Sequence, residues 1–295
     1  MRYHLAAFVT VCIWGSTFVF TKMLLVAGLS PAQIFTLRFL VAYVLMLAWS
    51  VARRAPMAAG SLGDEMLMLM LGVTGGSLYF MTENAALQYT TATNTSLIVC
   101  SCPLFAMLLV ALCYRRTERV TAIQAAGSVT AFAGMAIVVL NGRFVLHLSP
   151  RGDALAFGSC MCWAVYSLLM KMLSGRYSSL LITRKVFFYG LLTIVPYYAW
   201  RPHELLSLSD GGVVFSGEVV ACLLFLGVVA SMLCYLVWGW VIRHLGAVTA
   251  TNWVYFNPIT TIVFASYLLG ERITPWFLLG AALIIAGMFL CDHHP

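Results

Sequence analysis

The sequence predicts an all-α integral membrane protein with ten transmembrane helices arranged as two inverted five-helix repeats. Three observations predict this fold: the composition, the recurrence of long apolar segments, and a match between the two halves of the chain. Of the 295 residues, 62% are apolar and 9% are charged, whereas a soluble domain has about 45–50% apolar and about 25% charged residues. The composition excludes a soluble domain, a disordered chain, a nucleic-acid-binding protein and a disulfide scaffold.

Apolar segments long enough to cross a bilayer recur along the whole chain, since about 20 helical residues span a hydrocarbon core about 30 Å thick. They predict helices at about 4–27, 32–52, 65–88, 92–114, 120–140, 152–174, 180–200, 218–243, 247–270 and 275–292. Apolar runs such as 66–73 do not alternate with polar residues, which excludes a β-barrel. The longest loop, about 201–217, is too short for a nucleotide-binding domain, and no phosphate-binding loop motif occurs.

Basic residues gather at alternate ends of the predicted helices. One set of ends carries Arg2, Arg53, Arg54, Arg115, Arg116, Arg119, Lys171, Arg176 and Arg243, and the other carries only Arg143, Arg151, Arg201 and Arg272. The positive-inside rule therefore predicts that both termini are cytoplasmic. The first apolar segment is too long for a signal peptide, so we expect a retained helix and a multi-pass protein of the cytoplasmic (inner) membrane.

The second half of the chain repeats the first. Residues 5–24 match residues 154–173 at an offset of 149, and less common residues recur in the same order: Trp14 and Trp163, Lys22 and Lys171, Asn94 and Asn252, Pro103 and Pro258, Glu118 and Glu271. Apolar bias alone would match only scattered Leu and Ala. The repeats are predicted at 1–145 and 146–295. Five helices are an odd number, so the second repeat must be inverted, an architecture typical of secondary transporters.

Several of the repeated motifs resemble those of a known family. They are the Ile-Trp-Gly-Ser-Thr-Phe sequence at 13–18 with the following Lys22, the Glu-Arg-Val/Ile-Thr turn before the last helix of each half, and the Ala-Gly-Met sequence within that helix. Together they resemble the EamA family of the drug/metabolite transporter (DMT) superfamily, over essentially the whole chain. The resemblance implies a ten-helix exporter of amino acids, related metabolites or drugs, similar to YddG-type exporters of aromatic amino acids. It also implies a central cavity lined by the third, fourth, eighth and ninth helices, with parts of the first and sixth.

Glu83 is the carboxylate that falls clearly within a predicted span. A charged group in hydrocarbon costs at least about 2.5–3.5 kcal/mol, so it requires a partner or a wet cavity. Lys22 and Arg38 lie at a similar depth near the extracellular ends of their helices. We therefore predict that Glu83 pairs with Lys22 or Arg38 and helps to close the outer path. The alternative is that Glu83 takes up a proton and couples export to the proton gradient.

Two further cations, Lys171 and Lys185, are predicted near the cytoplasmic side without an acid beside them. They would attract a substrate carboxylate, or else extend to the inner headgroups.

Polar and aromatic residues at matched positions form the predicted substrate-binding surface. Aromatic rings stack on planar or apolar solutes, and Asn amides hold amino and carboxyl groups. Any one of these residues could instead pack against lipid or protein. The set comprises Trp14, Tyr79, Asn94, Trp163, Tyr235, Trp238, Asn252, Trp253, Tyr255 and Asn257.

Prolines and glycines also recur in both halves. Pro103 and Pro258 fall in mid-helix, where they would act as matched hinges or simply pack as static kinks. Gly127 and Gly134, like Gly280 and Gly287, are seven residues apart on the last helix of their half, which predicts close helix packing. The nine cysteines contain no C-x-x-C pair and are expected to pack as small apolar residues.

These patterns predict a secondary active transporter that exports small organic metabolites, amino acids foremost, by alternating access through a central cavity. The alternatives are an intramembrane enzyme or flippase acting on a lipid-linked substrate, and a receptor or sensor. Paired acids, a buried His and a nucleophile with a base are missing from the sequence, which disfavours an enzyme. We expect a small-molecule substrate and the lipid bilayer as partners, no nucleic acid, no cofactor and no metal, and a monomer or weak dimer.

Overall fold

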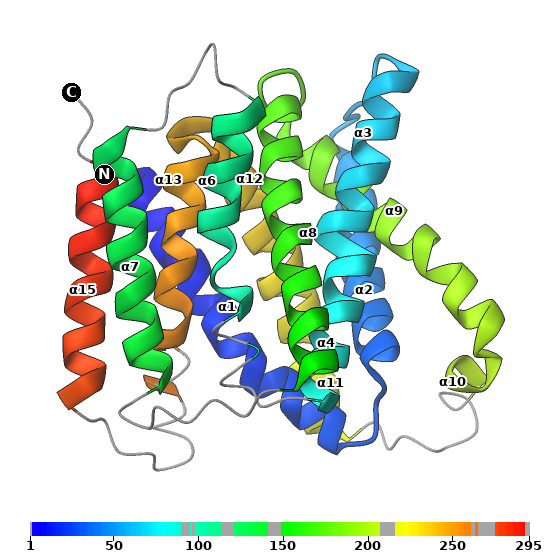
Figure 1. Cartoon of the computed structure of the whole chain (residues 1–295). Coiled ribbons are helices and arrows are strands. Elements are labelled where there is room, and N and C mark those ends of the chain that lie inside the picture. The colour runs from blue at the N-terminus through cyan, green and yellow to red at the C-terminus, as the bar shows by residue number, and fades with distance from the viewer. Residues whose placement is uncertain are drawn as a thin grey trace.

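The structure is a computed structural model that describes residues 2–89, 95, 98–113, 121–140, 149–206, 216–260, 263–264 and 275–292, and these residues contain no β-strand. They form helices throughout (Figure 1). The first half contains α1 (Arg2–Val26), α2 (Pro31–Ala52), α3 (Leu62–Gly72), the π-helical η1 (Val73–Ser77), α4 (Leu78–Tyr89), α6 (Cys102–Cys113) and α7 (Ala122–Leu140). The second contains α8 (Pro150–Ser174), α9 (Ser179–Trp200), α10 (Pro202–Leu206), α11 (Gly217–Leu224), the π-helical η2 (Phe225–Leu233), α12 (Cys234–Leu245), α13 (Ala247–Asn252), the 3₁₀-helical η3 (Trp253–Phe256) and α15 (Pro275–Asp292).

The chain is a multi-pass membrane protein. Seven helical segments in its described part are long and apolar enough to cross a membrane: Arg2–Val26, Pro31–Ala52, Leu62–Ala86, Ala122–Leu140, Pro150–Ser174, Ser179–Trp200 and Gly217–Leu245. Cys102–Cys113 and Pro275–Cys291 are apolar but shorter. The helices predicted at 92–114 and 247–270 are only partly described, so the count of ten remains a prediction.

Serine caps explain where several helices begin. Ser30 accepts a hydrogen bond from the Gln33 backbone N–H, Gln33 returns one to the Ser30 N–H, and Pro31 occupies the first turn of α2. The Ser61 side chain accepts a hydrogen bond from the Asp64 backbone N–H, so α3 begins three residues before the predicted residue 65. Ser178 and Ser216 cap α9 and α11, the second-half counterparts of α2 and α3.

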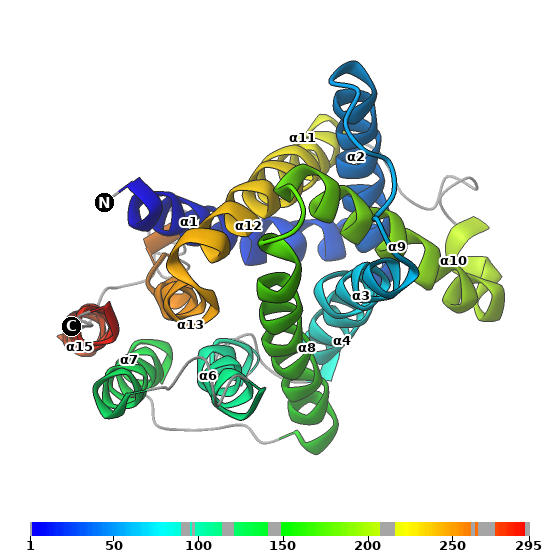
Figure 2. The same ribbon diagram turned by 90° about the horizontal axis from the view of Figure 1, so that it is seen from above.

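The last helices of the two halves, α7 and α15, lie side by side at the edge of the bundle (Figure 2). They run antiparallel, since Gly127 meets Gly287 and Gly134 meets Gly280. A Cβ atom at Gly127 would lie 2.6 Å from the Gly287 carbonyl oxygen, and one at Gly134 would lie 2.6 Å from the Gly280 oxygen. The two backbones are therefore in direct contact, as the glycine spacing predicted.

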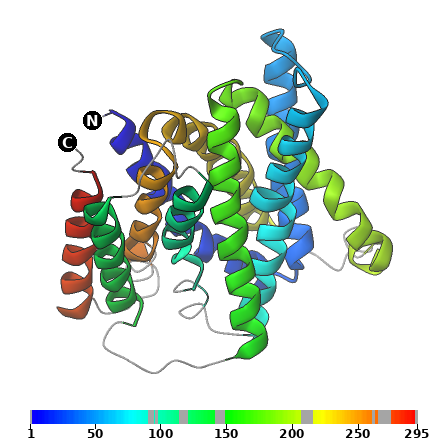
Figure 3. The ribbon, with the colours of Figure 1, turned by 45° about the horizontal axis from the view of Figure 1, so that its top comes forward.

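The remaining helices pack around α8. Viewed from above, α8 lies between α6 on one side and α3 and α4 on the other, and α1 lies along α12 (Figure 2). The largest fully buried side chains come from these central helices and include Trp238, Tyr166, Tyr235 and Tyr255. At one end of the bundle, α1 begins and α15 ends (Figure 3).

Pro103 is not in mid-helix, contrary to the prediction. The chain turns at Cys100 and Ser101, and Pro103 then occupies the first turn of α6. Proline is tolerated in a first turn because its missing N–H would have no helical partner there. Pro258 lies within the continuous helical residues 247–260, directly after the segment that changes from α to 3₁₀ geometry. Pro103 therefore follows an interruption of its helix, whereas Pro258 follows a change of helix geometry.

Candidate functional site

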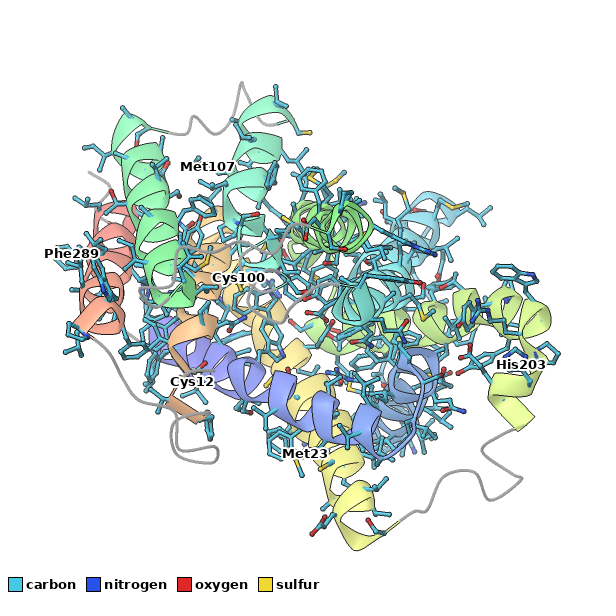
Figure 4. The ribbon with its side chains drawn as sticks, turned by 60° about the horizontal axis from the view of Figure 1, so that its bottom comes forward. Cys12, Met23, Cys100, Met107, His203 and Phe289 are labelled. Carbon is cyan, nitrogen blue, oxygen red and sulfur yellow. The ribbon has the colours of Figure 1, made fainter. Side chains whose placement is uncertain are left out.

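A small central cavity lies where the interrupted helices meet, and Cys100, which lines it, lies toward the middle of the bundle (Figure 4). Its volume is about 50 Å³, and a water molecule needs about 10–15 Å³ of such space, so the cavity has room for a few waters. The lining residues come from both halves: Trp14, Thr17, Arg38, Tyr79, Phe80, Glu83, Val99, Cys100, Cys102, Trp163, Tyr235, Val254 and Asn257.

Two of the helix interruptions are stabilised by side chains from the opposite half. In η1, Gly76 leaves the helical conformation, and the nearby Gly75 carbonyl accepts a 2.7 Å hydrogen bond from the Tyr235 hydroxyl of α12. In η2, the Ala230 carbonyl accepts a 2.9 Å bond from the Trp14 indole N–H of α1. Backbone groups freed from a helix within a membrane need such partners. These two bonds between the halves supply partners for backbone carbonyls in the π-helical segments η1 and η2.

Aromatic rings form much of the cavity wall. The ring centroids of Trp14 and Trp163 are 5.3 Å apart at an interplanar angle of 89°, and those of Tyr79 and Trp163 are 5.2 Å apart. Tyr235 stands edge-on to Trp14 at 5.9 Å. Among the described residues, the buried indole N–H of Trp163 has no hydrogen-bond partner, unlike that of Trp14.

One acid and one base line the same cavity without joining each other. Glu83 accepts a 3.0 Å hydrogen bond from the Tyr79 hydroxyl. Arg38 donates from Nε to Ser231 Oγ at 3.0 Å, and its guanidinium lies 4.5 Å from the centre of the Phe80 ring. Within the described part of the chain, neither has an ion-pair partner. The predicted direct pair of Glu83 with Arg38 is therefore wrong, because Ser231 and Phe80 hold the guanidinium.

The predicted binding residues fall into three groups. Trp14, Tyr79, Trp163, Tyr235 and Asn257 line the cavity, Trp238 packs behind Trp14 at 4.9 Å, and Tyr255 is fully buried. Asn252 and Trp253 instead line a second cavity. Asn94 and the side chain of Lys22 lie outside the described residues.

The 3₁₀ geometry of η3 separates neighbours that the sequence grouped together. Side chains three residues apart share a face of a 3₁₀ helix. Val254 and Asn257 therefore face the central cavity, whereas Trp253 and Phe256 face the second one.

Lys185 pairs with a carboxylate, so the prediction that it has no acid beside it is wrong. Its ammonium lies 2.8 Å from Glu65 Oε1, and Glu65 Oε2 accepts a 2.6 Å hydrogen bond from the Tyr189 hydroxyl. Asp64 makes a 2.6 Å ion pair with Arg176 and accepts a 2.7 Å bond from the Tyr177 hydroxyl. These residues join the start of α3 to α9 and to the turn between α8 and α9. Lys171 lies in the last turn of α8.

A second polar cluster surrounds Glu204 in α10, at the other end of α2 and α9. Its carboxylate accepts 2.7 Å hydrogen bonds from the hydroxyls of Ser30 and Tyr197, and Arg201 lies 3.3 Å away. Burial acts to raise the pKa of Glu204, but these donors and the positive charge outweigh it and hold the pKa below its usual value. Gln33 also donates to the Glu204 backbone carbonyl.

Sequence reasoning missed six of the lining residues: Thr17, Phe80, Val99, Cys100, Cys102 and Val254. Cys100 and Cys102 flank the chain turn just before Pro103, so a proline preceded by small polar residues was the available signal. No group of three His, Cys, Asp or Glu residues able to hold a metal ion occurs in the described ranges.

The family comparison matches both halves of the chain. The model of the EamA-like transporter family matches residues 1–140 and again residues 150–291. A protein of solved crystal structure has the same fold, with a TM-score of 0.77 at 17% identity, covering 99% of this chain and 97% of that one.

Curated relatives also match over nearly their whole length. An uncharacterised transporter of Archaeoglobus fulgidus is 30% identical over 97% of this chain and 96% of its own. A probable terminal-alkyne amino-acid exporter of Streptantibioticus cattleyicolor is 28% identical, covering 98% and 92% of the two chains. A probable amino-acid metabolite efflux pump of Escherichia coli is 23% identical, covering 96% and 92%. The chain belongs to the EamA-like transporter family, and it is a membrane transporter of the drug/metabolite superfamily.

Proposed function

We propose that this transporter is a secondary active exporter of amino acids or similar zwitterions. It would work by alternating access between two inverted five-helix repeats, with both termini in the cytoplasm. Two relatives, a probable terminal-alkyne amino-acid exporter and a probable amino-acid metabolite efflux pump, support this substrate class.

The observation that carries the proposal is the pair of separate charges in one cavity. Buried charges are costly unless they are paired, yet Arg38 and Glu83 line the cavity without a mutual ion pair. A zwitterion supplies both missing partners: its carboxylate binds the guanidinium, and its ammonium binds the Glu83 carboxylate. The Trp163 indole N–H is a further donor for the carboxylate, and the aromatic wall receives the solute side chain.

Three features support the inverted repeat. The matched helices α7 and α15 run antiparallel. The crosswise bonds from Tyr235 to Gly75 and from Trp14 to Ala230 connect equivalent interruptions in the two halves. The family model itself matches the chain twice.

The cavity must enlarge to accept an amino acid, since its volume of about 50 Å³ suits only a few waters. The interruption before Pro103 and the change of helix geometry before Pro258 provide places where α6 and the helix after η3 can change direction. In this mechanism both prolines mark hinges, and Lys22, Lys171 and Glu83 are the candidate gating or coupling groups. Lys185 acts only through its ion pair with Glu65.

Competition in proteoliposomes tests the zwitterion directly. We expect uptake of labelled phenylalanine into vesicles loaded with unlabelled phenylalanine, with competition by other amino acids. Phenethylamine and 3-phenylpropionate each lack one charge and should compete at least tenfold more weakly. Glu83→Gln should abolish this exchange, whereas Glu218→Gln in the first turn of α11, away from the cavity, should not change it. Equal competition by the amine and the acid would overturn the zwitterion assignment.

A mechanism coupled to protons makes a separate prediction. If Glu83 carries the coupling proton, Glu83→Gln should lose proton-driven accumulation but keep exchange. The loss of both activities would assign Glu83 to solute binding.

A further inference from the structure

A second and larger cavity lies between α1, α13, η3 and α15, away from the central site. Its volume is about 420 Å³, compared with about 50 Å³ at the centre. The lining residues are His4, Phe8, Thr249, Asn252, Trp253, Phe256, Ile285, Met288, Phe289 and Cys291. Most of them are apolar. A cavity of this size and composition can hold an extended hydrocarbon chain.

The cavity opens to the outside of the bundle. Phe289 is 63% exposed and Ile285 is 57% exposed, and Phe289 lies at the outer edge of the molecule (Figure 4). On the inner side, Phe8 packs edge-on against Phe256 at 5.1 Å between ring centroids. In a membrane protein the outer surface of such a helix contacts lipid, so the cavity opens to the bilayer.

The depth of the cavity matches that of a lipid glycerol backbone and upper acyl chain. It lies at the end of the bundle where α1 begins and α15 ends (Figure 1). His4 and Cys291 are close to this end. Phe8 and Ile285 are six and seven residues from the ends of α1 and α15, or roughly 9–10 Å along the helix at 1.5 Å per residue. The headgroup layer of each leaflet is about 5–8 Å thick, so this span reaches from the headgroups into the upper part of the acyl chains.

One polar group in the apolar wall has an unused hydrogen-bond donor. Asn252 is 2% exposed, and its Oδ1 accepts a 3.2 Å hydrogen bond from Ser128 Oγ. Its Nδ2 has no partner in the part of the chain that the structure describes. Buried donors are normally paired. At this depth the acceptors that a bilayer offers are the ester carbonyls of its lipids.

We propose that this cavity binds one glycerophospholipid. An acyl chain lies against Phe8, Phe256 and Ile285, and an ester carbonyl accepts a hydrogen bond from Asn252 Nδ2. The bound lipid fills the space between α1 and α15 and so connects the two halves on the side that faces the membrane. The site is separate from the central cavity and does not depend on which solute is carried.

Native mass spectrometry of the full chain in detergent, titrated with 1-palmitoyl-2-oleoyl-phosphatidylethanolamine, tests the site. We expect one lipid to bind with an affinity at least fivefold above that of any further lipid. Ile285→Trp fills the cavity and should reduce the bound fraction at least fivefold. Leu278→Trp adds the same ring at a similarly exposed position of α15 outside the cavity, and it should leave binding unchanged. Equal binding by both variants would overturn the site.

The diether analogue of the same lipid, which has no ester carbonyl, tests the role of Asn252. The wild-type protein should bind the diester at least threefold more tightly than the diether. Asn252→Leu should remove this preference while the protein still binds the diether. No preference in the wild type would overturn the hydrogen bond, and an unchanged preference in Asn252→Leu would do the same.

Discussion

Charged residues at the ends of the bundle have several hydrogen-bond and ion-pair partners, whereas those in the central cavity have few. At the ends, Asp64 and Glu65 each have a cationic partner and a tyrosine hydroxyl, and Glu204 has Ser30, Tyr197 and Arg201. In the cavity, among the residues that the structure describes, Glu83 accepts one hydrogen bond, from Tyr79, and Arg38 donates one, to Ser231, and lies over the Phe80 ring.

In the proposed mechanism, this difference separates groups that hold the fold from groups that serve transport. Fully paired charges join helices. Incompletely paired charges would acquire partners when a solute enters, because a buried charge without hydrogen bonds is costly. Substitutions in the two regions should therefore affect different measurements.

The largest effect is expected for Arg38→Met. The change removes the cation that we propose binds the solute carboxylate, and a hydrogen bond to a charged group is worth about 1.5–3 kcal/mol. Exchange of phenylalanine in proteoliposomes should fall roughly 10–150-fold, the equivalent of that energy. The melting temperature should stay the same or rise, since an incompletely paired buried charge is removed. A large fall in melting temperature would instead place Arg38 among the structural charges.

Lys185→Met should show the reverse pattern. It leaves Glu65 with hydrogen bonds but without its cation, which should lower the free energy of unfolding by about 1–3 kcal/mol. We expect a lower melting temperature in detergent, with the exchange rate per folded molecule unchanged. The double variant Glu65→Gln with Lys185→Met should recover part of the melting temperature that the single variant loses. If the single variant transports poorly but melts normally, Lys185 takes part in the solute path.

The two tryptophans offer a comparison within the cavity itself. Trp14→Phe removes the bond to the Ala230 carbonyl and should lower stability by about 0.5–1.5 kcal/mol. Trp163→Phe removes an indole N–H that has no partner among the described residues, so it should weaken phenylalanine binding with little change in stability. Thermal melts with and without phenylalanine separate the two outcomes. Equal loss of stability in both variants would contradict this difference.

The smallest effect is expected when the pH is lowered, and it is an effect on stability through Glu204. The pKa of Glu204 is held below its usual value in the folded protein, so its ionised form stabilises the fold. This contribution is complete above the unfolded-state value, about 4.3, and is lost as the pH falls toward the lower folded-state pKa. The wild type should melt at a higher temperature than Glu204→Gln at pH 7, and this difference in melting temperature should shrink as the pH is lowered to 3.5. If the difference in melting temperature stays constant across this pH range, protonation of Glu204 does not cause the loss of stability in acid.

The membrane-protein class and most helix positions followed from the sequence because apolar length is a local and strong signal. Glu83 and Arg38 stood out for a similar reason, since charge is rare within predicted spans. Their separation did not follow, because Ser231 lies 193 residues from Arg38 in the chain. Only the three-dimensional packing shows which of several groups a buried cation contacts.

The local sequence also does not predict where the helices are interrupted. Thr74, Gly75 and Gly76 form part of a continuous apolar segment, and the Tyr235 hydroxyl that bonds the Gly75 carbonyl at the break is far away in sequence. The residues around Asn252 appeared to be one binding cluster because they are adjacent in sequence. The change from α13 to the 3₁₀ geometry of η3 directs them to two different cavities.

The crosswise bond between Tyr235 and Gly75 has a consequence for how the protein is made. The two residues are 160 positions apart. At about 5–20 residues per second, the ribosome reaches Tyr235 roughly 8–30 s after it adds Gly75. During that interval the nascent first half is already long enough to enter the bilayer, yet the Gly75 carbonyl has no hydroxyl to bind. The hydrogen bond between Tyr235 and Gly75 can therefore form only late in synthesis, after the first half of the chain has had time to enter the bilayer.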